Sequence, residues 1–400
     1  MSSRAHAAPA AEEEIPLDNE ARRKGSLEVD KLFRLVVAKG GSDLHLKTGK
    51  PPMMRYKGDI LTFDQLGYKV PVLDARNMEK LLMPMMNERL RRIHERDGGA
   101  DFAHVVTIED GSTRRFRVNI LKQRGDLGLV ARLVNATIPS FDKLFLPPIL
   151  ADVCMHHQGL IILAGITGSG KSTTIGSMLN FVNSKRRCHI LTIEDPIEYL
   201  FTDELAVVNQ REVGIDVSTW EIALKHAMRE DPDVMLVGEM RDHETFNAAV
   251  HAAETGHLVF GTIHANTAPS TIGRILDLFP PDMHNAIRQT LAFNLKAIIA
   301  QKLIKTTEEW QNKGVTRVPI NEVMLVNSSI RKAISENQDA RMADLLKVSE
   351  AEGMQDFTKA LKDRVESDMI TREAAFEVAP NADALKMALK GIKLPVSGLR

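Results

Sequence analysis

Residues 165–172, Gly-Ile-Thr-Gly-Ser-Gly-Lys-Ser, have the spacing of a loop that binds nucleotide phosphates. Glycines in this pattern let backbone N–H groups converge on a phosphate, and the helix that follows adds partial positive charge. Lys171 would neutralise the β- and γ-phosphates, and Ser172 would hold Mg²⁺. The alternative is a glycine-rich turn with a chance Lys-Ser pair. The candidate contact residues are Gly165, Thr167, Gly168, Ser169, Gly170, Lys171, Ser172 and Thr173.

Acidic residues follow two later apolar runs. Glu194 and Glu198 come after residues 190–193, and Glu239 follows residues 234–237 in a Walker B-like pattern. Ligands of open α/β sheets bind beyond the carboxyl ends of the strands, so these acids could orient the attacking water or hold a metal through water. The alternatives are a solvated acidic turn for the first two and a helix-capping acid for Glu239.

Two histidines bracket the next apolar run, residues 258–263. His264 follows its carboxyl end and could donate a hydrogen bond to the γ-phosphate, or it could be a core histidine with satisfied bonds. His257 precedes the run at the far end, so a structural and a functional role stay equally open. The other histidines lack the spacing of metal ligands, and we expect them on the surface.

Two arginines of the N-terminal part are candidates for charge compensation. The phosphate-loop chemistry supplies no obvious arginine from its own half of the chain, although charge developing on the transferred phosphoryl group favours an added cation. Arg117 and Arg132 lie on the exposed side of predicted strands. In a ring they could reach a neighbour's nucleotide; otherwise they belong to an ordinary solvated strand face. Arg241 and Asp242 could form a local ion pair of little energetic consequence.

The elements that must position these residues change character along the chain. Short, continuously apolar runs after residue 149 alternate with helical segments and predict a parallel sheet covered on both faces. Before residue 135, alternating strands and a helix over 75–95 predict an antiparallel α+β domain. The expected divisions are a disordered tail (1–27), an N-terminal α+β domain (28–135), a linker (136–148), an α/β core (149–327) and a helical C-terminal region (328–400).

Composition narrows the class of protein. The chain has 400 residues, and its hydrophobic content of 44% is typical of a globular protein. Its formal net charge of −1 argues against a motor that acts on nucleic acid. No apolar run approaches the roughly 20 residues of a transmembrane helix, and no signal peptide is recognisable. The two cysteines lack metal-site spacing and indicate a reducing compartment. We expect a cytoplasmic protein without a membrane span.

Four ordered motifs resemble the boxes of the type II/type IV secretion ATPase superfamily. They are the phosphate loop, Thr-Ile-Glu-Asp-Pro-Ile-Glu (192–198), Leu-Val-Gly-Glu-Met-Arg-Asp (236–242), and the histidine-containing segment 252–264. Within the superfamily, residues 28–390 are similar to the PilT/PilU branch, the type IV pilus retraction ATPases. Gly-Ser-Asp-Leu-His (41–45), Arg-Phe-Arg-Val-Asn (115–119) and Gly-Met-Gln (353–355) also match that branch.

The resemblance implies a homohexameric ring of subunits with a PAS-like N-terminal domain and a RecA-like P-loop domain. ATP and Mg²⁺ would bind at Lys171 and Ser172, with Glu194, Glu198 and Glu239 as catalytic or metal-water acids. His257 and His264 match the histidine box, and Arg117 and Arg132 match arginines that point at nucleotide. Hydrolysis at the cytoplasmic face of the inner membrane would act on the pilus platform protein and depolymerise pilin, with a second retraction ATPase as a further possible partner.

One segment departs from the retraction pattern. Residues 335–339, Ser-Glu-Asn-Gln-Asp, replace the usual glycine-containing turn after the Ser-Ile-Arg helix at 329–331. The departure bears on retraction and leaves the ATPase prediction untouched. The alternatives are an extension or type II secretion ATPase, which usually carries an extra N-terminal domain and often a four-cysteine zinc cluster, and a catalytically weak accessory ring subunit.

Overall fold

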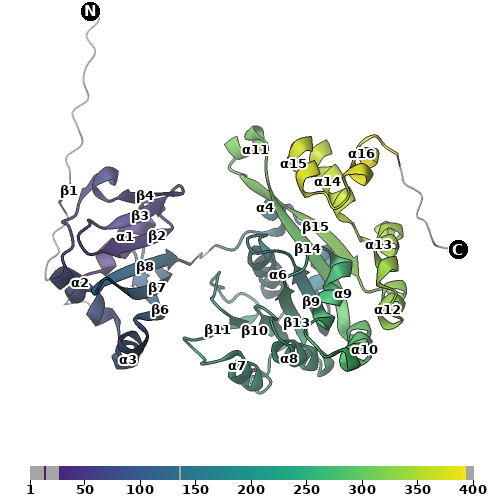
Figure 1. The fold of residues 1–400 in the computed structure, drawn as a ribbon, viewed down its shortest axis with the longest axis horizontal. Coiled ribbons are helices and arrows are strands. Elements are labelled where there is room, and N and C mark those ends of the chain that lie inside the picture. Colours follow the sequence, from purple (N-terminus) through teal and green to yellow (C-terminus); the bar gives the residue numbers. More distant parts are fainter. Residues whose placement is uncertain (1–12, 15–26, 135–136, 393–400) are drawn as a thin grey trace, which may run out of the picture. The chain divides into compact units, whose positions relative to one another are not determined.

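The computed structural model describes residues 13–14, 27–134 and 137–392, and the chain divides into two compact units at Ala136/Thr137 (Figure 1). Most of the predicted tail, residues 1–27, lies outside the described residues. Within it, β1 (Glu13–Glu14) pairs in parallel with β5 (Tyr68–Lys69). The last eight residues, 393–400, are also outside the description.

Unit 1 is the predicted α+β domain, built on a six-stranded antiparallel sheet of order β4-β3-β2-β8-β7-β6. Its core forms because alternate residues of β7 face inward: Phe116, Val118 and Ile120 are fully buried. Phe116 meets the ring of Phe33 edge-on, with 4.8 Å between centroids. The strands are β2 (Asp43–Lys47), β3 (Met53–Tyr56), β4 (Asp59–Thr62), β6 (Gly99–Thr107), β7 (Thr113–Gln123) and β8 (Asp126–Leu133).

The helices of unit 1 are α1 (Asp30–Ala38), α2 (Ala75–Leu82) and α3 (Glu88–Asp97). The single helix expected over 75–95 is therefore wrong in one respect: it is broken into α2, a 3₁₀ turn and α3. Pro84 lies in the break and cannot donate the backbone hydrogen bond that a continuous helix needs. Asn87 then restarts the helix, because its side chain accepts a hydrogen bond from the N–H of Leu90 at 2.9 Å.

Unit 2 contains a seven-stranded sheet of order β11-β10-β12-β13-β9-β14-β15, in which only the β14–β15 pair is antiparallel. Every residue of β9, β12 and β13 is buried, as a parallel sheet covered on both faces requires. The predicted α/β core is confirmed. The strands are β9 (Gly159–Ala164), β10 (His189–Glu194), β11 (Val207–Glu212), β12 (Val234–Val237), β13 (Leu258–Ile263), β14 (Leu295–Lys305) and β15 (Arg317–Leu325).

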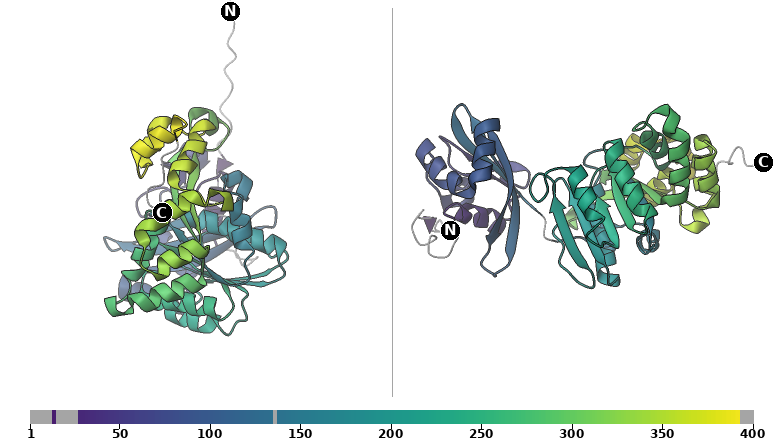
Figure 2. Two further views of the ribbon diagram at one scale, coloured as in Figure 1. Left: turned by 90° about the vertical axis from the view of Figure 1, so that its right-hand side faces the viewer. Right: turned by 90° about the horizontal axis from the view of Figure 1, so that it is seen from below.

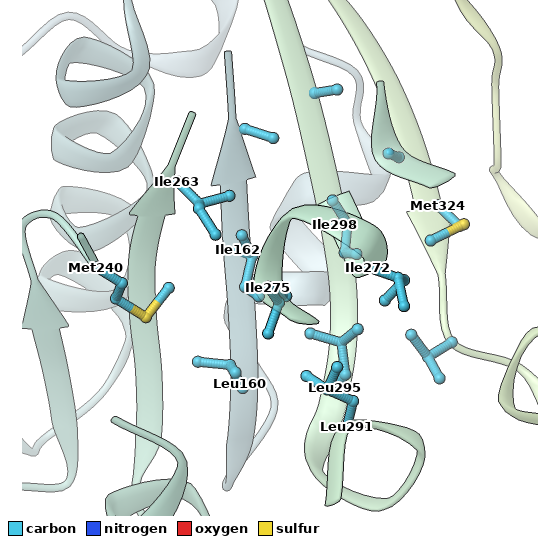
Figure 3. Close-up of a cluster of buried hydrophobic side chains, with 14 of the residues drawn as sticks. Leu160, Ile162, Met240, Ile263, Ile272, Ile275, Leu291, Leu295, Ile298 and Met324 are labelled. Carbon is cyan, nitrogen blue, oxygen red and sulfur yellow. The ribbon is translucent and has the colours of Figure 1, made fainter. Parts of the chain in front are cut away.

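Two groups of helices cover the faces of this sheet (Figures 1 and 2). The side chains of α5 and α6 pack with Ile161, Leu163 and Phe260 on one face. Those of α7 to α10 pack on the other face with Leu160, Ile162 and Ile263, part of the cluster drawn in Figure 3. The helices are α5 (Ile149–Cys154), α6 (Lys171–Lys185), α7 (Trp220–Ala227), α8 (His243–Glu254), α9 (Ala268–Leu276) and α10 (His284–Asn294).

The expected linker, 136–148, is too long. From residue 137 the chain belongs to unit 2, and α4 (Phe141–Leu144) packs on α6 through stacked rings of Phe141 and Phe181, 5.2 Å apart. Leu146 is buried in the same cluster. The prolines of this stretch indicated a linker, but its Phe and Leu side chains are the apolar groups that dock it against the core.

The described residues after 327 are largely helical as predicted, yet they pack into the same core as the sheet. In the segment that precedes the helix at Phe357, Gln355 exchanges two backbone hydrogen bonds with Val323 of β15, at 2.8 and 3.1 Å. Short helix α11 (Glu308–Asn312) lies between β14 and β15 in sequence. The C-terminal helices are α12 (Ser328–Ser335), α13 (Asp339–Val348), α14 (Phe357–Glu366), α15 (Arg372–Val378) and α16 (Ala382–Leu389).

A buried cation ties α13 to α10. Both terminal nitrogens of Arg288 donate to the carboxylate of Asp339, at 2.7 and 2.6 Å, and Arg288 also donates to the carbonyl of Ile334 at 3.3 Å. The side chain of Arg288 is 7% exposed and that of Asp339 is 34% exposed. Removing the carboxylate would leave the guanidinium buried without its counter-ion, which is the costly way to break such a pair.

We therefore expect Asp339→Ala to lower the free energy of unfolding of unit 2 by about 2 kcal/mol and its melting temperature by roughly 5 °C. Differential scanning calorimetry of the full chain measures this shift. Asp344→Ala is the matched control, because Asp344 only forms a half-exposed pair with Lys347 at 3.7 Å. Equal melting temperatures for the two variants would contradict the account.

Candidate nucleotide site

The predicted phosphate loop connects the carboxyl end of β9 to the start of α6. Gly168 and Gly170 have φ angles of +78° and +85°, which residues with a side chain rarely adopt. A Cβ added at Gly168 would meet nothing within 4 Å, so the loop is open on that side. The first N–H groups of a helix have no partner within the helix, and α6 begins at Lys171. Together the loop and helix end form a site suited to an anion.

Lys171 folds back over this loop. Its ammonium group donates to the carbonyl of Gly165 at 2.7 Å and to that of Ile166 at 3.1 Å. Burial lowers the pKa of Lys171, while the charge of Glu239 acts in the opposite direction. A partly desolvated ammonium held only by carbonyls gains from a nearby phosphate, so the residues present fit a nucleotide phosphate group.

The next two residues lie on the first turn of α6. Ser172 is exposed, so its hydroxyl is accessible for Mg²⁺. The hydroxyl of Thr173 is 2.9 Å from the hydroxyl of Tyr199, in the loop after β10. Tyr199 follows Glu198 in the sequence and carried no motif signal. Within the described residues, no group of three or more His, Cys, Asp or Glu side chains could hold a metal by itself.

Parallel register brings His264 and Glu239 to the same edge of the sheet. Ile263 pairs with Ala164, so His264 and the loop residue Gly165 both come one residue beyond the paired positions. The imidazole Nε2 of His264 is 2.9 Å from Oε1 of Glu239. The hydroxyl of Thr262 donates to the carbonyl of Gly238 at 2.6 Å and fixes the chain just before Glu239.

Arg241 is the second partner of Glu239, at 2.6 Å from Oε2. This hydrogen bond, followed by the charges of Arg241 and His264, lowers the pKa of Glu239 despite partial burial. The expected Arg241–Asp242 pair is therefore wrong: Asp242 instead caps α8, accepting from the N–H of Thr245 at 2.8 Å. Glu239 is thus not the cap of that helix, and it stays ionised near Lys171.

Glu194 is the last residue of β10, the neighbour of β12, and Glu198 lies in the loop that follows. Glu194 is buried, and it accepts hydrogen bonds from Thr192 (2.7 Å) and Gln210 (3.3 Å) on one carboxylate oxygen. Burial raises the pKa of Glu194 to about 7. Glu198 is exposed, and its backbone N–H bonds to the Glu194 carboxylate. The backbone N–H of Gly238 donates to the carbonyl of Ile193 at 2.9 Å, which joins the ends of the two strands.

His257 is not brought to this edge. Its carbonyl accepts a hydrogen bond from the N–H of Gly159, the first residue of β9 (3.0 Å), whereas the phosphate loop follows the last residue. Its ring Nδ1 is 2.8 Å from the carbonyl of Ala252. A six-residue strand, about 20 Å long, separates the two ends. Within one chain, His257 has a structural position.

Arg117 and Arg132 lie in unit 1. They are directly paired across β7 and β8, and both are exposed. Arg132 donates to Asp43 at 2.9 Å, and that bond and its charge help lower the pKa of Asp43 against the effect of burial. Their predicted approach to nucleotide stays a prediction.

The sequence profile of the family described as "Type II/IV secretion system protein" matches residues 105–376. The chain belongs to this family. It is 38% identical to the type IV pilus ATPase PilU of Pseudomonas aeruginosa over 364 residues, covering 91% of this chain and 92% of that protein. It is also 38% identical to the type IV pilus retraction ATPase PilT of the same organism over 353 residues, covering 88% and 98%.

Solved structures agree. A crystal structure of the pilus retraction motor PilT with bound ADP matches with a TM-score of 0.80 and 40% identity, covering 90% of this chain and 98% of that one. The Legionella pneumophila ATPase DotB matches with a TM-score of 0.69 at 23% identity, which supports the fold alone. The predicted secretion-ATPase family and its retraction branch are confirmed. Among the described helices, none is long and apolar enough to cross a membrane.

The buried carboxyl of Glu194 predicts a pH dependence of stability. Its folded pKa, about 7, exceeds the ordinary value of 4.5. The folded state therefore binds the proton more tightly, so the contribution of Glu194 to stability is favourable at low pH and is lost as pH rises from about 4.5 through 7. Gln keeps the acceptor oxygen for Thr192 and Gln210 but carries no charge.

We expect Glu194→Gln to match the wild type in free energy of unfolding at pH 5 and to exceed it by about 2 kcal/mol at pH 8. Urea denaturation without nucleotide or Mg²⁺ at several pH values measures the difference. Glu221→Gln, at an exposed position on α7, serves as control. A difference that is flat with pH would contradict the buried-acid assignment.

Proposed function

We propose that this protein is an ATP-hydrolysing motor subunit that powers type IV pilus retraction. The observation that carries the proposal is the cluster of Lys171, Glu239 and His264 at the loop end of the parallel sheet, in a chain that aligns with PilT and PilU over nearly their whole length. Both relatives are named as ATPases, and the residues of unit 2 expected for that chemistry, apart from His257, lie at or just beyond the carboxyl ends of the parallel strands.

The chemistry would use the chain's charges in distinct roles. Lys171 would leave its loop carbonyls and neutralise phosphate oxygens. Glu239, kept ionised by Arg241 and His264, would orient the attacking water and take up its proton. A carboxylate with a lowered pKa is a weak base, so the hydrogen bond from Arg241 must break before Glu239 can act.

Mg²⁺ would be held by the exposed hydroxyl of Ser172 and by water molecules placed by Glu239, where it would neutralise charge on the phosphate oxygens. Glu194 is the second candidate base, because a carboxyl with a pKa of about 7 can exchange a proton at neutral pH. Its burial and its bonds to Thr192 and Gln210 favour a supporting role. Glu198 would act at the same edge of the sheet, through water molecules that it orients.

A further cation for the phosphates would come from a neighbouring subunit. Arg117 and Arg132 are paired, exposed and within one unit, which suits a surface that meets a second copy in a homohexamer. Domain movement driven by hydrolysis would then act on the platform protein at the cytoplasmic face of the inner membrane. A second retraction ATPase would be a partner in the same system.

Two alternative functions can be distinguished from a retraction motor: a type II secretion ATPase and an accessory ring subunit. Type II secretion proteins E align over only part of their length, for example 30% of the Aeromonas hydrophila protein, so the chain does not span that class. An accessory ring subunit with weak turnover is compatible with the equal identity to PilU and PilT, 38% in each case. The intact cluster around Glu239 favours an active enzyme.

We expect Glu239→Gln to bind ATP within about threefold of the wild-type affinity and to hydrolyse it roughly 100-fold more slowly, because the amide cannot accept the proton. Steady-state turnover and ATP binding of the purified full chain measure both. In a strain deleted for this gene, the wild-type gene should restore pilus retraction in live imaging and the variant should not.

Glu230→Gln is the control, since Glu230 is not one of the candidate site residues and forms an ion pair with Arg211 at 2.6 Å. Wild-type turnover in Glu239→Gln would transfer the role of base to Glu194 or Glu198. Normal retraction in the deleted strain would contradict the retraction function, and slow wild-type turnover in vitro would favour the accessory subunit.

Mixing two inactive variants tests the action of unit 1 across subunits. Arg117→Ala keeps the phosphate loop, and Lys171→Ala keeps the arginine, so mixed rings should regain part of the wild-type ATPase rate while each variant alone is inactive. Turnover measured against the mixing ratio gives the result. Mass spectrometry of the rings confirms mixing, and mixed rings without recovered activity would contradict donation of Arg117 to a neighbour.

A further inference from the structure

The phosphate loop rests on a strand that its sequence motif does not include. β14 runs parallel to β9, and Ala300 pairs with Ala164. Gln301 therefore comes one residue beyond this pair, level with Gly165. A Cβ at Gly165 would be 2.6 Å from the carbonyl oxygen of Gln301, and one at Gly170 would be 2.9 Å from its side-chain nitrogen. These two glycines are thus required for the close approach to β14.

The side-chain amide of Gln301 makes three hydrogen bonds in this contact. Its Nε2 donates to the carbonyl of Ser169 at 2.6 Å. Its Oε1 accepts from the hydroxyl of Thr174 at 2.7 Å and from the side-chain amide of Asn321 on β15 at 2.8 Å. Gln301 and Asn321 are each 2% exposed and Thr174 is 1% exposed, so water does not compete with these bonds.

The orientation of this amide follows from its partners. A backbone carbonyl can only accept a hydrogen bond, so the atom of Gln301 that faces Ser169 must be the nitrogen. The other atom is then the oxygen, which the two donors from Thr174 and Asn321 satisfy. Asn321 is held in turn, because the side chain of Gln355 donates to its backbone carbonyl at 2.8 Å.

The direction of a backbone carbonyl also sets the direction of the N–H in the same peptide unit. In a planar trans peptide the C=O of Ser169 and the N–H of Gly170 point in opposite directions. With the carbonyl drawn toward β14, the N–H of Gly170 points away from β14. Without the bond from Gln301, this peptide unit could rotate, which the glycine at 170 permits at low cost.

We propose that Gln301 is a positioning residue for nucleotide binding: it holds the Ser169–Gly170 peptide so that the N–H of Gly170 is presented to a phosphate before the nucleotide arrives. The proposal rests on the nucleotide binding proposed above. It adds a residue outside the four sequence motifs, and it makes the β14–β15 pair a fixed support of the phosphate loop. Thr174 and Asn321 act through Gln301 by holding its amide.

The test compares Gln301→Met, Gln301→Glu and the control Gln289→Met in the full chain. Met has similar length and no donor, so the carbonyl of Ser169 loses its partner. Gln289 is exposed, and its amide donates to a backbone carbonyl outside the phosphate loop, that of Ser335 at 3.3 Å. The readouts are the Kd of ADP, KM and kcat for ATP, and amide hydrogen exchange of residues 165–172 in the nucleotide-free protein.

We expect Gln301→Met to raise both the Kd of ADP and the KM for ATP about tenfold, with kcat within about threefold of the wild type. Exchange in residues 165–172 should speed up without any nucleotide present. Thr174→Val, which removes one bond to the Gln301 oxygen, should give the same pattern with a smaller increase and is the second variant if Gln301→Met folds poorly.

Gln301→Glu supplies a pH signature that a packing role would lack. Burial raises the pKa of a carboxyl group, and its protonated form has an O–H that can donate to Ser169. The ratio of its Kd to that of the wild type should therefore fall at least fivefold from pH 8 to pH 6. A pH-independent ratio, or wild-type Kd and exchange in Gln301→Met with only a lower melting temperature, would overturn the proposal. Wild-type protein that binds no ADP would instead contradict the proposed function, and the exchange measurement would still decide the role of Gln301.

Discussion

The register of four parallel strands is the constraint on which the site depends. β10, β12, β13 and β9 lie side by side with their carboxyl ends at one edge, and each is followed by a residue or loop of the site. Because side chains alternate along a strand, a slip of one residue would turn the apolar residues of β9 and β13 to the wrong faces. Burial on both faces therefore fixes the distance between the phosphate loop and His264.

Charged groups of both signs gather at this edge. Glu239 is shared between Arg241 and His264, and the ammonium group of Lys171 donates to two backbone carbonyls. Burial at the same time raises the pKa of Glu194 to about 7. An arrangement of this kind responds to an added anion, because a phosphate can attract Lys171 and change the partners of Glu239. The supports beneath it, Gln301 and Thr262, are neutral and buried and need not change.

The sequence predicts most of this candidate site because the motifs lie at strand ends, and strand ends are marked by apolar runs. Lys171, Glu239 and His264 are candidates of this kind, and the structure brings them to one edge of the sheet. The ion pair expected between Arg241 and Asp242 does not form, because adjacency in the sequence does not determine the directions of two side chains. His257 matches a motif, but its position before the strand places it at the opposite edge within one chain.

The parts of the fold that the sequence does not predict are those without a local sequence pattern. β14 begins immediately after α10, at Leu295, with no turn residue between them, so the sequence gives no sign that Gln301 neighbours the phosphate loop. Phe141 and Leu146 were hidden among prolines that indicated a linker. In each case a contact between distant segments decided the structure, and such contacts leave little trace in a single sequence.

The most direct test of the account is equilibrium binding of ATP to the purified full-length protein by calorimetry, with and without Mg²⁺. The account predicts one ATP per chain, tighter binding when Mg²⁺ is present, and loss of binding in Lys171→Ala. Equal affinity of the wild type and Lys171→Ala for ATP, or no heat of binding in either, would contradict the assignment of residues 165–172 as the nucleotide site.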